Sequence, residues 1–163
     1  MENASSNRQS TPGDYAKIKE IIDLSFPRFF RYFANHSVTS KDGKVLVSET
    51  QGRISGFIKL IEFKIGSRKY GCVLWIAIHP SYQRRGIAFS LTNAGKDYLK
   101  NDGSHAVFAS TQIRNKAAQA TLGKAGFRRM GFLGLWQVFG WRLFSLYSDI
   151  WYAPGEVVFI HNS

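Results

Sequence analysis

The feature that most constrains the fold is an apolar strand that leads directly into a basic, glycine-containing turn. Val73–Ile78 is the longest apolar run of the chain, and it ends at His79-Pro80, where proline cannot continue a β-ladder. The turn Gln83-Arg84-Arg85-Gly86-Ile87-Ala88 follows. Apolar residues then recur at helical spacing, which predicts a helix from about Gly86 to Leu99. A central strand, a short loop and a helix in this order are typical of an α/β protein.

This turn has the composition of an anion site. The first residues of a helix carry N–H groups without intrahelical partners, and they lie at the positive end of the helix dipole. Gly86 and Ala88 have small side chains that let an anion approach the backbone, and Arg84 and Arg85 add positive charge. The segment therefore predicts a phosphate-binding site at the start of the helix.

The rest of the chain predicts an antiparallel meander followed by strand–helix–strand crossovers. Gln51-Gly52 and Ile65-Gly66-Ser67 are turn signals between strand-like segments, and tight turns join antiparallel neighbours. The expected elements are a strand near Asn7–Gln9, a helix from Thr11-Pro12 to about Ser25, a short helix opening at Pro27, strands around Val45–Val47, over Ile54–Phe63 and over Tyr70–Ile78, the helix Gly86–Leu99, a strand Ala106–Thr111, a short helix starting at Asn115, a strand Arg128–Phe132, a helix Leu133–Tyr147 and a strand Glu156–His161.

Composition narrows the classes of protein. The length fits one domain over residues 1–163, because no linker or repeat divides it. With 22 basic and 11 acidic residues the net charge is +11, which favours an anionic partner such as nucleic acid, an anionic membrane or a phosphorylated small molecule.

No apolar run could span a bilayer, and the polar start lacks a signal-peptide core, so we expect a soluble, cytoplasmic protein. The single cysteine, Cys72, excludes an internal disulfide, and the histidines show no metal-ligand spacing, so no metal is expected.

Two motifs in this order resemble the GCN5-related N-acetyltransferase (GNAT) superfamily. In that family the pattern Gln/Arg-x-x-Gly-x-Gly/Ala cradles the pyrophosphate of acetyl-CoA, and residues 83–88 fit it. A later helix of the family carries Asn, then Ala three residues on, then Gly-Phe. These positions are occupied here by Asn115, Ala118, Gly126 and Phe127. The resemblance covers roughly residues 8–132 and implies an α/β fold with a mixed, mainly antiparallel sheet flanked by helices on both faces.

The resemblance also implies acetyl-CoA as co-substrate and assigns contacts to it. The strand end Ile76-Ala77-Ile78 would offer backbone groups to the pantetheine arm, and an N–H near Ile76 would polarise the thioester carbonyl. Asn115 would contact the pantetheine or the adjacent diphosphate, and Lys124 or another nearby base would meet the 3′-phosphate. The implied cofactor-binding residues are Ile76, Ala77, Ile78, Gln83, Arg84, Arg85, Gly86, Ile87, Ala88, Phe89, Ser90, Asn115, Ala118 and Lys124.

The acid–base positions of the family depart from its pattern. Many members protonate the leaving thiolate with a tyrosine at the position of Leu122. Their general-base glutamate falls at the position of Ser110 or, in members that acetylate lysine, of Cys72. Without a base, weakly basic amines are the easier acceptors: at pH 7 neutralising a lysine costs about 4.6 kcal/mol, and neutralising an α-amine costs about 1 kcal/mol.

The candidate base is Glu62. A turn centred near Ser67 would place Glu62 directly across from Cys72, and directly paired residues point to the same face of a sheet. His79, or a water chain to a distant carboxylate, is an alternative. The candidate acid is Tyr147, with Tyr152 as the alternative from the same segment.

Residues 133–152 are rich in aromatic side chains and are the least family-like part of the chain. We interpret them as core or as a lid over the acceptor pocket, and next as a homodimer surface. A membrane-surface helix is disfavoured because the segment lacks a charged face.

The sequence therefore predicts an N-acetyltransferase that moves an acetyl group from acetyl-CoA to a primary amine, on a small molecule or a protein, by direct attack in a ternary complex. The alternative is a catalytically weak CoA-binding or sensing protein of the same fold. A third hypothesis is a basic module that associates with nucleic acid, for which the chain shows no recognition motif.

Overall fold

The computed structural model describes residues 5–162, and the chain divides into two compact units. One unit comprises Met1–Leu60 with Trp75–Gly95, and the other comprises Ile61–Leu74 with Lys96–Ser163. The expectation of one domain over residues 1–163 stays a prediction.

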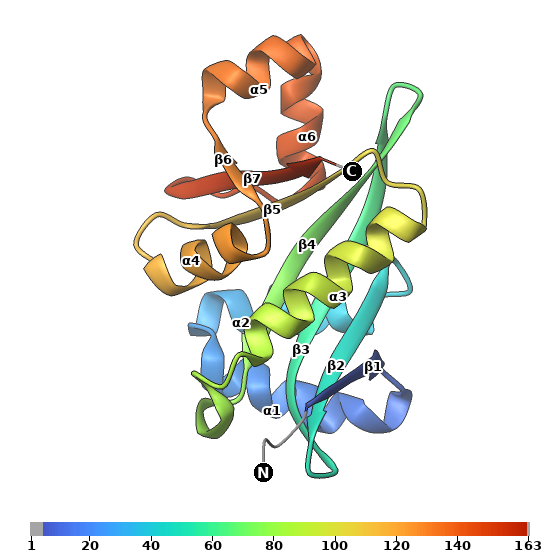
Figure 1. Cartoon of the computed structure of the whole chain (residues 1–163), viewed down its shortest axis with the longest axis vertical. Helices are drawn as coiled ribbons and strands as arrows, with labels where there is room; N and C mark the ends of the chain where they lie inside the picture. Colours follow the sequence, from blue (N-terminus) through green and yellow to red (C-terminus); the bar gives the residue numbers. More distant parts are fainter. Residues whose placement is uncertain (1–4, 163) are drawn as a thin grey trace. The chain divides into compact units, whose positions relative to one another are not determined.

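The elements follow the expected order along the chain (Figure 1). They are β1 (Ser6–Gln9), the short 3₁₀ helix η1 (Pro12–Asp14), α1 (Tyr15–Ser25), α2 (Arg28–Thr39), β2 (Lys44–Thr50), β3 (Arg53–Ile65), β4 (Arg68–Ile78), η2 (Pro80–Tyr82), α3 (Ile87–Asn101), β5 (Ala106–Gln112), α4 (Lys116–Lys124), β6 (Arg128–Met130), α5 (Phe132–Phe139), η3 (Gly140–Arg142), α6 (Leu143–Asp149) and β7 (Glu156–Asn162).

The strands form a seven-stranded sheet in the order β1-β2-β3-β4-β5-β7-β6. β1, β2 and β3 pair antiparallel, as do β5, β7 and β6. β4 and β5 are parallel, and their ladder joins Gly71–Val73 to Val107–Ala109, although β5 continues to Gln112. This sheet confirms the expected α/β class with a mixed, mainly antiparallel sheet.

In the first unit, helices cover both faces of the strands. Val47 and Phe57 are fully buried and pack in one cluster with the apolar face of α1. On the opposite face, a Cβ on Gly95 of α3 would lie 2.8 Å from the side chain of Leu60. α3 therefore approaches the strand closely at the position where α3 carries glycine.

A carboxylate on η1 ties the start of α1 to β1. Asp14 accepts hydrogen bonds from the Arg8 guanidinium at 2.8 and 3.1 Å, from the backbone N–H of Thr11 at 2.7 Å and from the Thr11 hydroxyl at 3.0 Å. The Arg8 hydrogen bonds, together with those from Thr11, hold the pKa of Asp14 well below its usual range.

We expect Asp14→Asn to lower the free energy of unfolding at pH 7 by about 2–3 kcal/mol, because charge-assisted hydrogen bonds are lost. The folded-state pKa of Asp14 is depressed, so its stabilisation is present above the unfolded pKa of about 3.9 and is lost as the pH falls. Urea unfolding of both proteins from pH 7 to pH 3 measures this, and the difference between them should shrink with acid. The exposed Lys19–Asp23 pair supplies the control, because Asp23→Asn should change stability by less than about 0.5 kcal/mol. An equal loss in both variants would contradict the prediction.

In the second unit, β5 and β7 share one core with α5 and α6. Phe108 is fully buried, and its ring centroid lies 5.8 Å from that of Tyr70 and 5.9 Å from that of Phe139. A Cβ on Gly71 of β4 would lie within 3.0 Å of the Leu99 side chain. The strand can pass that buried leucine only because it carries glycine at this position.

The structure corrects the expected single helix Leu133–Tyr147. Gly140 has a φ of 53°, so α5 ends there, and the chain turns through η3 before α6 begins. A left-handed residue cannot continue a right-handed helix, and the apolar pattern on either side conceals the break. The strand expected over Arg128–Phe132 is also shorter, since β6 ends at Met130 and Phe132 opens α5.

The aromatic segment 133–152 is partly core and partly surface. Leu143 and Leu146 are fully buried, whereas Leu133 is 75% and Trp141 is 78% exposed. Its roles as a lid or a dimer surface stay predictions. Across residues 5–162, the helices lack the combination of length and apolar character that crossing a bilayer requires.

Candidate functional site

In the first unit, the turn between β4 and α3 presents backbone N–H groups that have no acceptor. The preceding N–H groups are bonded within the turn: Tyr82 donates to the His79 carbonyl at 2.8 Å, and Gln83 donates to that of Pro80 at 3.4 Å. From Arg84 to Phe89, no backbone N–H has an acceptor within the described residues 5–162. The N–H groups of this run are therefore available to a ligand.

The conformation of the turn suits a diphosphate. Arg84 and Gly86 have φ angles of 60° and 77°, and left-handed residues within a turn direct successive N–H groups into one concavity. A Cβ on Gly86 would meet nothing within 4 Å, so the space beside it is open. The Arg85 guanidinium lies 5.4 Å from the centre of the Tyr82 ring, a cation–π contact that keeps the charge at the turn.

Some of the other predicted cofactor-binding residues of this unit are buried, and others are exposed to solvent. Ala77, Ile78 and Ile87 are buried, and Ile76 is half-buried. The Gln83 side chain donates to the Ile78 carbonyl at 3.3 Å, and the Thr92 hydroxyl donates to that of Ala88 at 2.7 Å. Phe89 is exposed, and the Ser90 hydroxyl accepts a hydrogen bond from Asn7 at 2.8 Å.

In the second unit, Asn115 and Ala118 form a helix cap. The Asn115 Oδ1 accepts the backbone N–H of Ala118 at 3.1 Å, which satisfies a free N–H at the start of α4. Lys124 is exposed in the last turn of the same helix, where a cation complements the helix dipole. Their contacts with the cofactor stay predictions.

The expected placement of Glu62 is wrong. Its neighbours Ile61 and Phe63 pack against the core cluster that contains Cys72. Successive side chains of a strand point to opposite faces, so Glu62 lies on the face away from Cys72. The turn consists of positions 66 and 67, so its centre lies half a residue before the centre that the prediction assumed. A shift of this size changes the pairing of the two strands and moves a side chain to the other face of the sheet.

On that face Glu62 belongs to an ion-pair cluster. Its Oε1 lies 2.9 Å from the Nζ of Lys69, which also pairs with Asp102. Partial burial raises the pKa of Glu62, and the Asp102 carboxylate adds to this rise while Lys69 opposes it. Glu62 shares the Lys69 ammonium with a second carboxylate on the face away from Cys72, and its role as the base stays a prediction.

The two candidate acids and the single cysteine, Cys72, lie in the second unit. Tyr147 of α6 stacks on Tyr152 with ring centroids 4.4 Å apart, and burial raises the pKa of its phenol. The Tyr152 hydroxyl donates to the backbone carbonyl of Glu156 at 3.3 Å. Burial also raises the pKa of Cys72, with a smaller contribution from the Glu156 carboxylate, so its thiol stays protonated. A protonated, buried thiol is not a nucleophile.

Sequence reasoning missed a carboxylate that lies beside Ser110. The Glu156 Oε2 accepts hydrogen bonds from the Ser110 hydroxyl at 2.9 Å and from the Ala153 N–H at 3.1 Å. In the register of β5 and β7, Glu156 lies opposite Gln112, and Ser110 is two residues earlier on the same face. The only sequence signal was an acid at the start of the last predicted strand, and it did not indicate which strand would be its neighbour.

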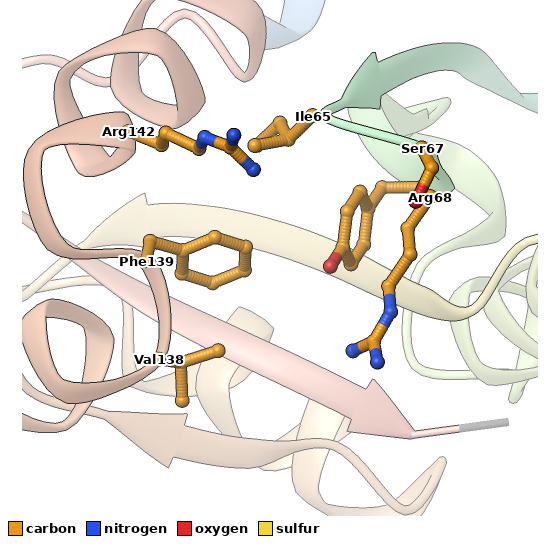
Figure 2. Close-up of a pocket in the computed structure, with 7 residues that line it drawn as sticks. Ile65, Ser67, Arg68, Val138, Phe139 and Arg142 are labelled. Atoms are coloured by element: carbon orange, nitrogen blue, oxygen red, sulfur yellow. The ribbon is translucent and has the colours of Figure 1, made fainter.

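A pocket of about 310 Å³ opens elsewhere in the second unit (Figure 2). Arg142 and Arg68 present guanidinium groups to it, and Phe139 and Tyr70 form its apolar wall. No predicted site residue lines it. Over residues 5–162, His, Cys, Asp and Glu side chains do not gather in threes as a metal site requires.

The mixed, mainly antiparallel sheet is the one that the family resemblance implies, and comparison with known families agrees. The model of the Acetyltransferase (GNAT) family matches residues 14–127. The chain therefore belongs to the GNAT family.

Individual relatives also support membership of the GNAT family. N-alpha-acetyltransferase 30 of Schizosaccharomyces pombe is 34% identical over 64 residues, which cover 39% of this chain and 43% of that protein. Among solved structures, the ribosomal-protein-S18-alanine N-acetyltransferase of Escherichia coli has a TM-score of 0.68 at 16% identity and covers 98% of this chain and 94% of its own. A GNAT-family acetyltransferase of Brucella melitensis, in complex with acetyl-CoA, has a TM-score of 0.57 at 18% identity over 77% of this chain and 84% of its own. At sequence identities of 16% and 18%, these two structures show that the fold is shared.

Proposed function

We propose that this chain is an acetyl-CoA-dependent N-acetyltransferase that acetylates a primary amine. The observation that carries the proposal is the run of N–H groups from Arg84 to Phe89 without acceptors in residues 5–162. The N–H groups at the start of a helix have no intrahelical acceptors, and an anion that accepts hydrogen bonds from several of them is stabilised there. Membership of the GNAT family supplies the class of reaction.

In this proposal the turn binds the pyrophosphate of CoA. The N–H groups of residues 84–89 donate to the phosphate oxygens, and Arg84 and Arg85 contribute charge. The backbone of Ile76-Ala77-Ile78 binds the pantetheine arm, and an N–H near Ile76 stabilises the oxyanion that forms on the thioester carbonyl. Asn115 and Lys124 would add contacts to the pantetheine and the 3′-phosphate.

The reaction proposed is direct attack in a ternary complex. The amine nitrogen adds to the thioester carbon, and the C–S bond then breaks to release the thiol of CoA. No covalent acetyl-enzyme is needed, in line with the burial of Cys72 and the raised pKa of its thiol.

An α-amine is the favoured acceptor. Neutralising an α-amine at pH 7 costs about 1 kcal/mol, against about 4.6 kcal/mol for a lysine side chain. The fission yeast relative is named for acetylation of α-amines, and the E. coli structure is named for the alanine of a ribosomal protein. Both names support a protein N-terminus as the acceptor of this chain.

The alternative is a CoA-binding protein with little catalysis. It is favoured by the absence of the usual groups at three family positions, which hold Leu122, Ser110 and Cys72.

Calorimetry with CoA, followed by thiol release from acetyl-CoA, tests the proposal. Alaninamide, Nα-acetyl-lysinamide and phenethylamine represent three kinds of amine. We expect CoA binding and thiol release, with alaninamide the fastest acceptor at pH 7 and its advantage shrinking towards pH 10. Absence of CoA binding would overturn the proposal. Binding of CoA without thiol release from any amine would favour the alternative.

A further inference from the structure

The pocket of about 310 Å³ in the second unit is a cationic cavity. It opens between the hairpin of β3 and β4 and the segment from α5 to η3, and all of its lining residues belong to the second unit. The described residues that line it include two arginines, Arg68 and Arg142, and no Asp or Glu. Neither arginine forms an ion pair within residues 5–162. Two guanidinium groups that face one cavity without a carboxylate attract an anion.

The fold positions both guanidinium groups at the pocket. Arg142 extends from η3, and Arg68 extends from β4 (Figure 2). A Cβ on Gly66, in the turn between β3 and β4, would lie 2.5 Å from Nη1 of Arg142, so this guanidinium rests against a residue without a side chain. The Nη1 of Arg68 lies 3.3 Å from Nε2 of His105, and because a guanidinium carries only donors, the imidazole nitrogen accepts. These contacts hold the two cations beside the pocket.

A third donor of the pocket, the Tyr70 hydroxyl, has no partner. The Tyr70 side chain is only 4% exposed, and its ring packs edge-to-face on Phe139 with centroids 5.6 Å apart. The hydroxyl forms no hydrogen bond within residues 5–162, and its oxygen is not sealed from solvent. A tyrosine that is buried to this extent usually has a hydrogen-bond partner. Because Tyr70 lines the pocket, its hydroxyl is available to an acceptor there.

The remaining lining of the pocket is largely apolar. Ile65 and Phe139 are buried side chains, and Val138 is exposed at the rim. A ligand in the pocket would therefore contact hydrocarbon as well as the two cations. A phosphate monoester carries a charge of about −1.5 to −2 at pH 7 and has three acceptor oxygens, so it matches two guanidinium groups and one hydroxyl. A carboxylate supplies one charge and two oxygens.

We propose that this pocket binds a small phosphate monoester that carries an apolar group. Arg142 and Arg68 bind the phosphate oxygens, and the Tyr70 hydroxyl donates a further hydrogen bond. The apolar group packs on Phe139. The site goes beyond the proposed acetyl transfer, because none of the predicted acetyl-CoA-binding residues lines the pocket. A ligand bound here joins the β3–β4 hairpin to α5 and η3, so it stabilises the second unit.

Calorimetric titration of the full chain with phenyl phosphate tests the site. The buffer contains no phosphate, and CoA is present at saturation. Under the proposed function CoA fills the anion-binding turn of the first unit, so any remaining binding reports on another site. We expect phenyl phosphate to bind with a dissociation constant below about 1 mM, with and without CoA.

Four variants locate the bound phosphate. Arg142→Gln and Arg68→Gln each remove one cation, and we expect each to weaken phenyl phosphate binding by about tenfold or more. Tyr70→Phe keeps the ring and removes only the hydroxyl, so binding should weaken by about threefold. Arg129→Gln is the matched control and should leave binding unchanged. Arg129 is an exposed arginine of β6 that lies outside the pocket lining and forms no ion pair within residues 5–162.

Two further probes define the class of ligand. Benzoate keeps the ring of phenyl phosphate and carries a single charge, whereas inorganic phosphate keeps the charge and lacks the ring. We expect both to bind more weakly than phenyl phosphate, by about fivefold or more. Benzoate that binds as tightly as phenyl phosphate would overturn the assignment of a phosphate group. Inorganic phosphate that binds as tightly would overturn the assignment of an apolar group.

The outcomes also separate this site from the proposed function. Absence of phenyl phosphate binding at millimolar concentration overturns the proposal, and so does loss of binding when CoA is saturating. Equal dissociation constants for Arg142→Gln and Arg129→Gln overturn it as well. A chain that does not bind CoA contradicts the proposed function instead, and the comparison of these two variants still decides whether the phosphate lies in the pocket.

Discussion

Gly86→Asp is expected to weaken CoA binding by about 150-fold. The new carboxylate would lie about 5 Å from a bound diphosphate, and at an effective dielectric constant of about 20 such a repulsion amounts to about 3 kcal/mol. A Cβ at this position meets no atom within 4 Å, so the substitution does not disturb the packing of the turn. Calorimetric titration with CoA measures the effect.

Gly86→Asn is the matched control for this charge. Asparagine has the same shape as aspartate and tolerates the left-handed conformation that Gly86 adopts at φ 77°. Both variants should lose a similar stability of about 1 kcal/mol for that conformation. We expect Gly86→Asn to bind CoA within about fivefold of the wild type. Equal dissociation constants for the two variants would show that no anion binds beside Gly86.

Phe108→Ala is expected to lower the free energy of unfolding by about 3–5 kcal/mol. Its ring is fully buried in the second unit, where it contacts Phe63, Tyr70 and Phe139 at centroid distances of 5.8 to 6.4 Å. Truncation removes this buried surface and leaves a cavity that a packed core refills only in part. Urea unfolding gives the midpoint, and an unchanged slope confirms that stability alone has changed.

Phe144→Ala removes the same atoms from the surface. Phe144 is 59% exposed, so we expect a change within about 0.5 kcal/mol. Phe108→Leu should fall between the two variants, with a loss of about 1–2 kcal/mol. A Phe108→Ala protein as stable as Phe144→Ala would show that the described core around Phe108 does not form.

Most of the elements followed from local patterns. Gln51 and Gly52 both adopt positive φ angles, 51° and 73°, in the hairpin turn that their types indicated. Asn115 caps its helix with its own side chain, as its position before an alanine-rich segment predicted. The exception is the segment after Phe132, where one left-handed glycine divides the expected helix. Apolar periodicity does not reveal such a break, because both halves bury the same type of side chain.

The candidate site also combines a part that depends on contiguous residues with a part that depends on contacts between distant strands. The anion site depends on residues 83–88, which are contiguous, so composition and glycine placement alone indicated it. The base depends on which side chains meet across strands. Glu62 was assigned to the wrong face because a shift of half a residue in one turn changes the face of every side chain beyond it.

The sequence alone determined the order of the elements, the basic turn that begins α3 and, through its two motifs, the GNAT family. Only the tertiary structure decided that Glu62 pairs with Lys69 and that Glu156 reaches Ser110 across 46 residues of chain. The physical reason is that backbone conformation depends on neighbours along the chain, whereas contacts between side chains depend on the pairing and register of strands that are distant in sequence.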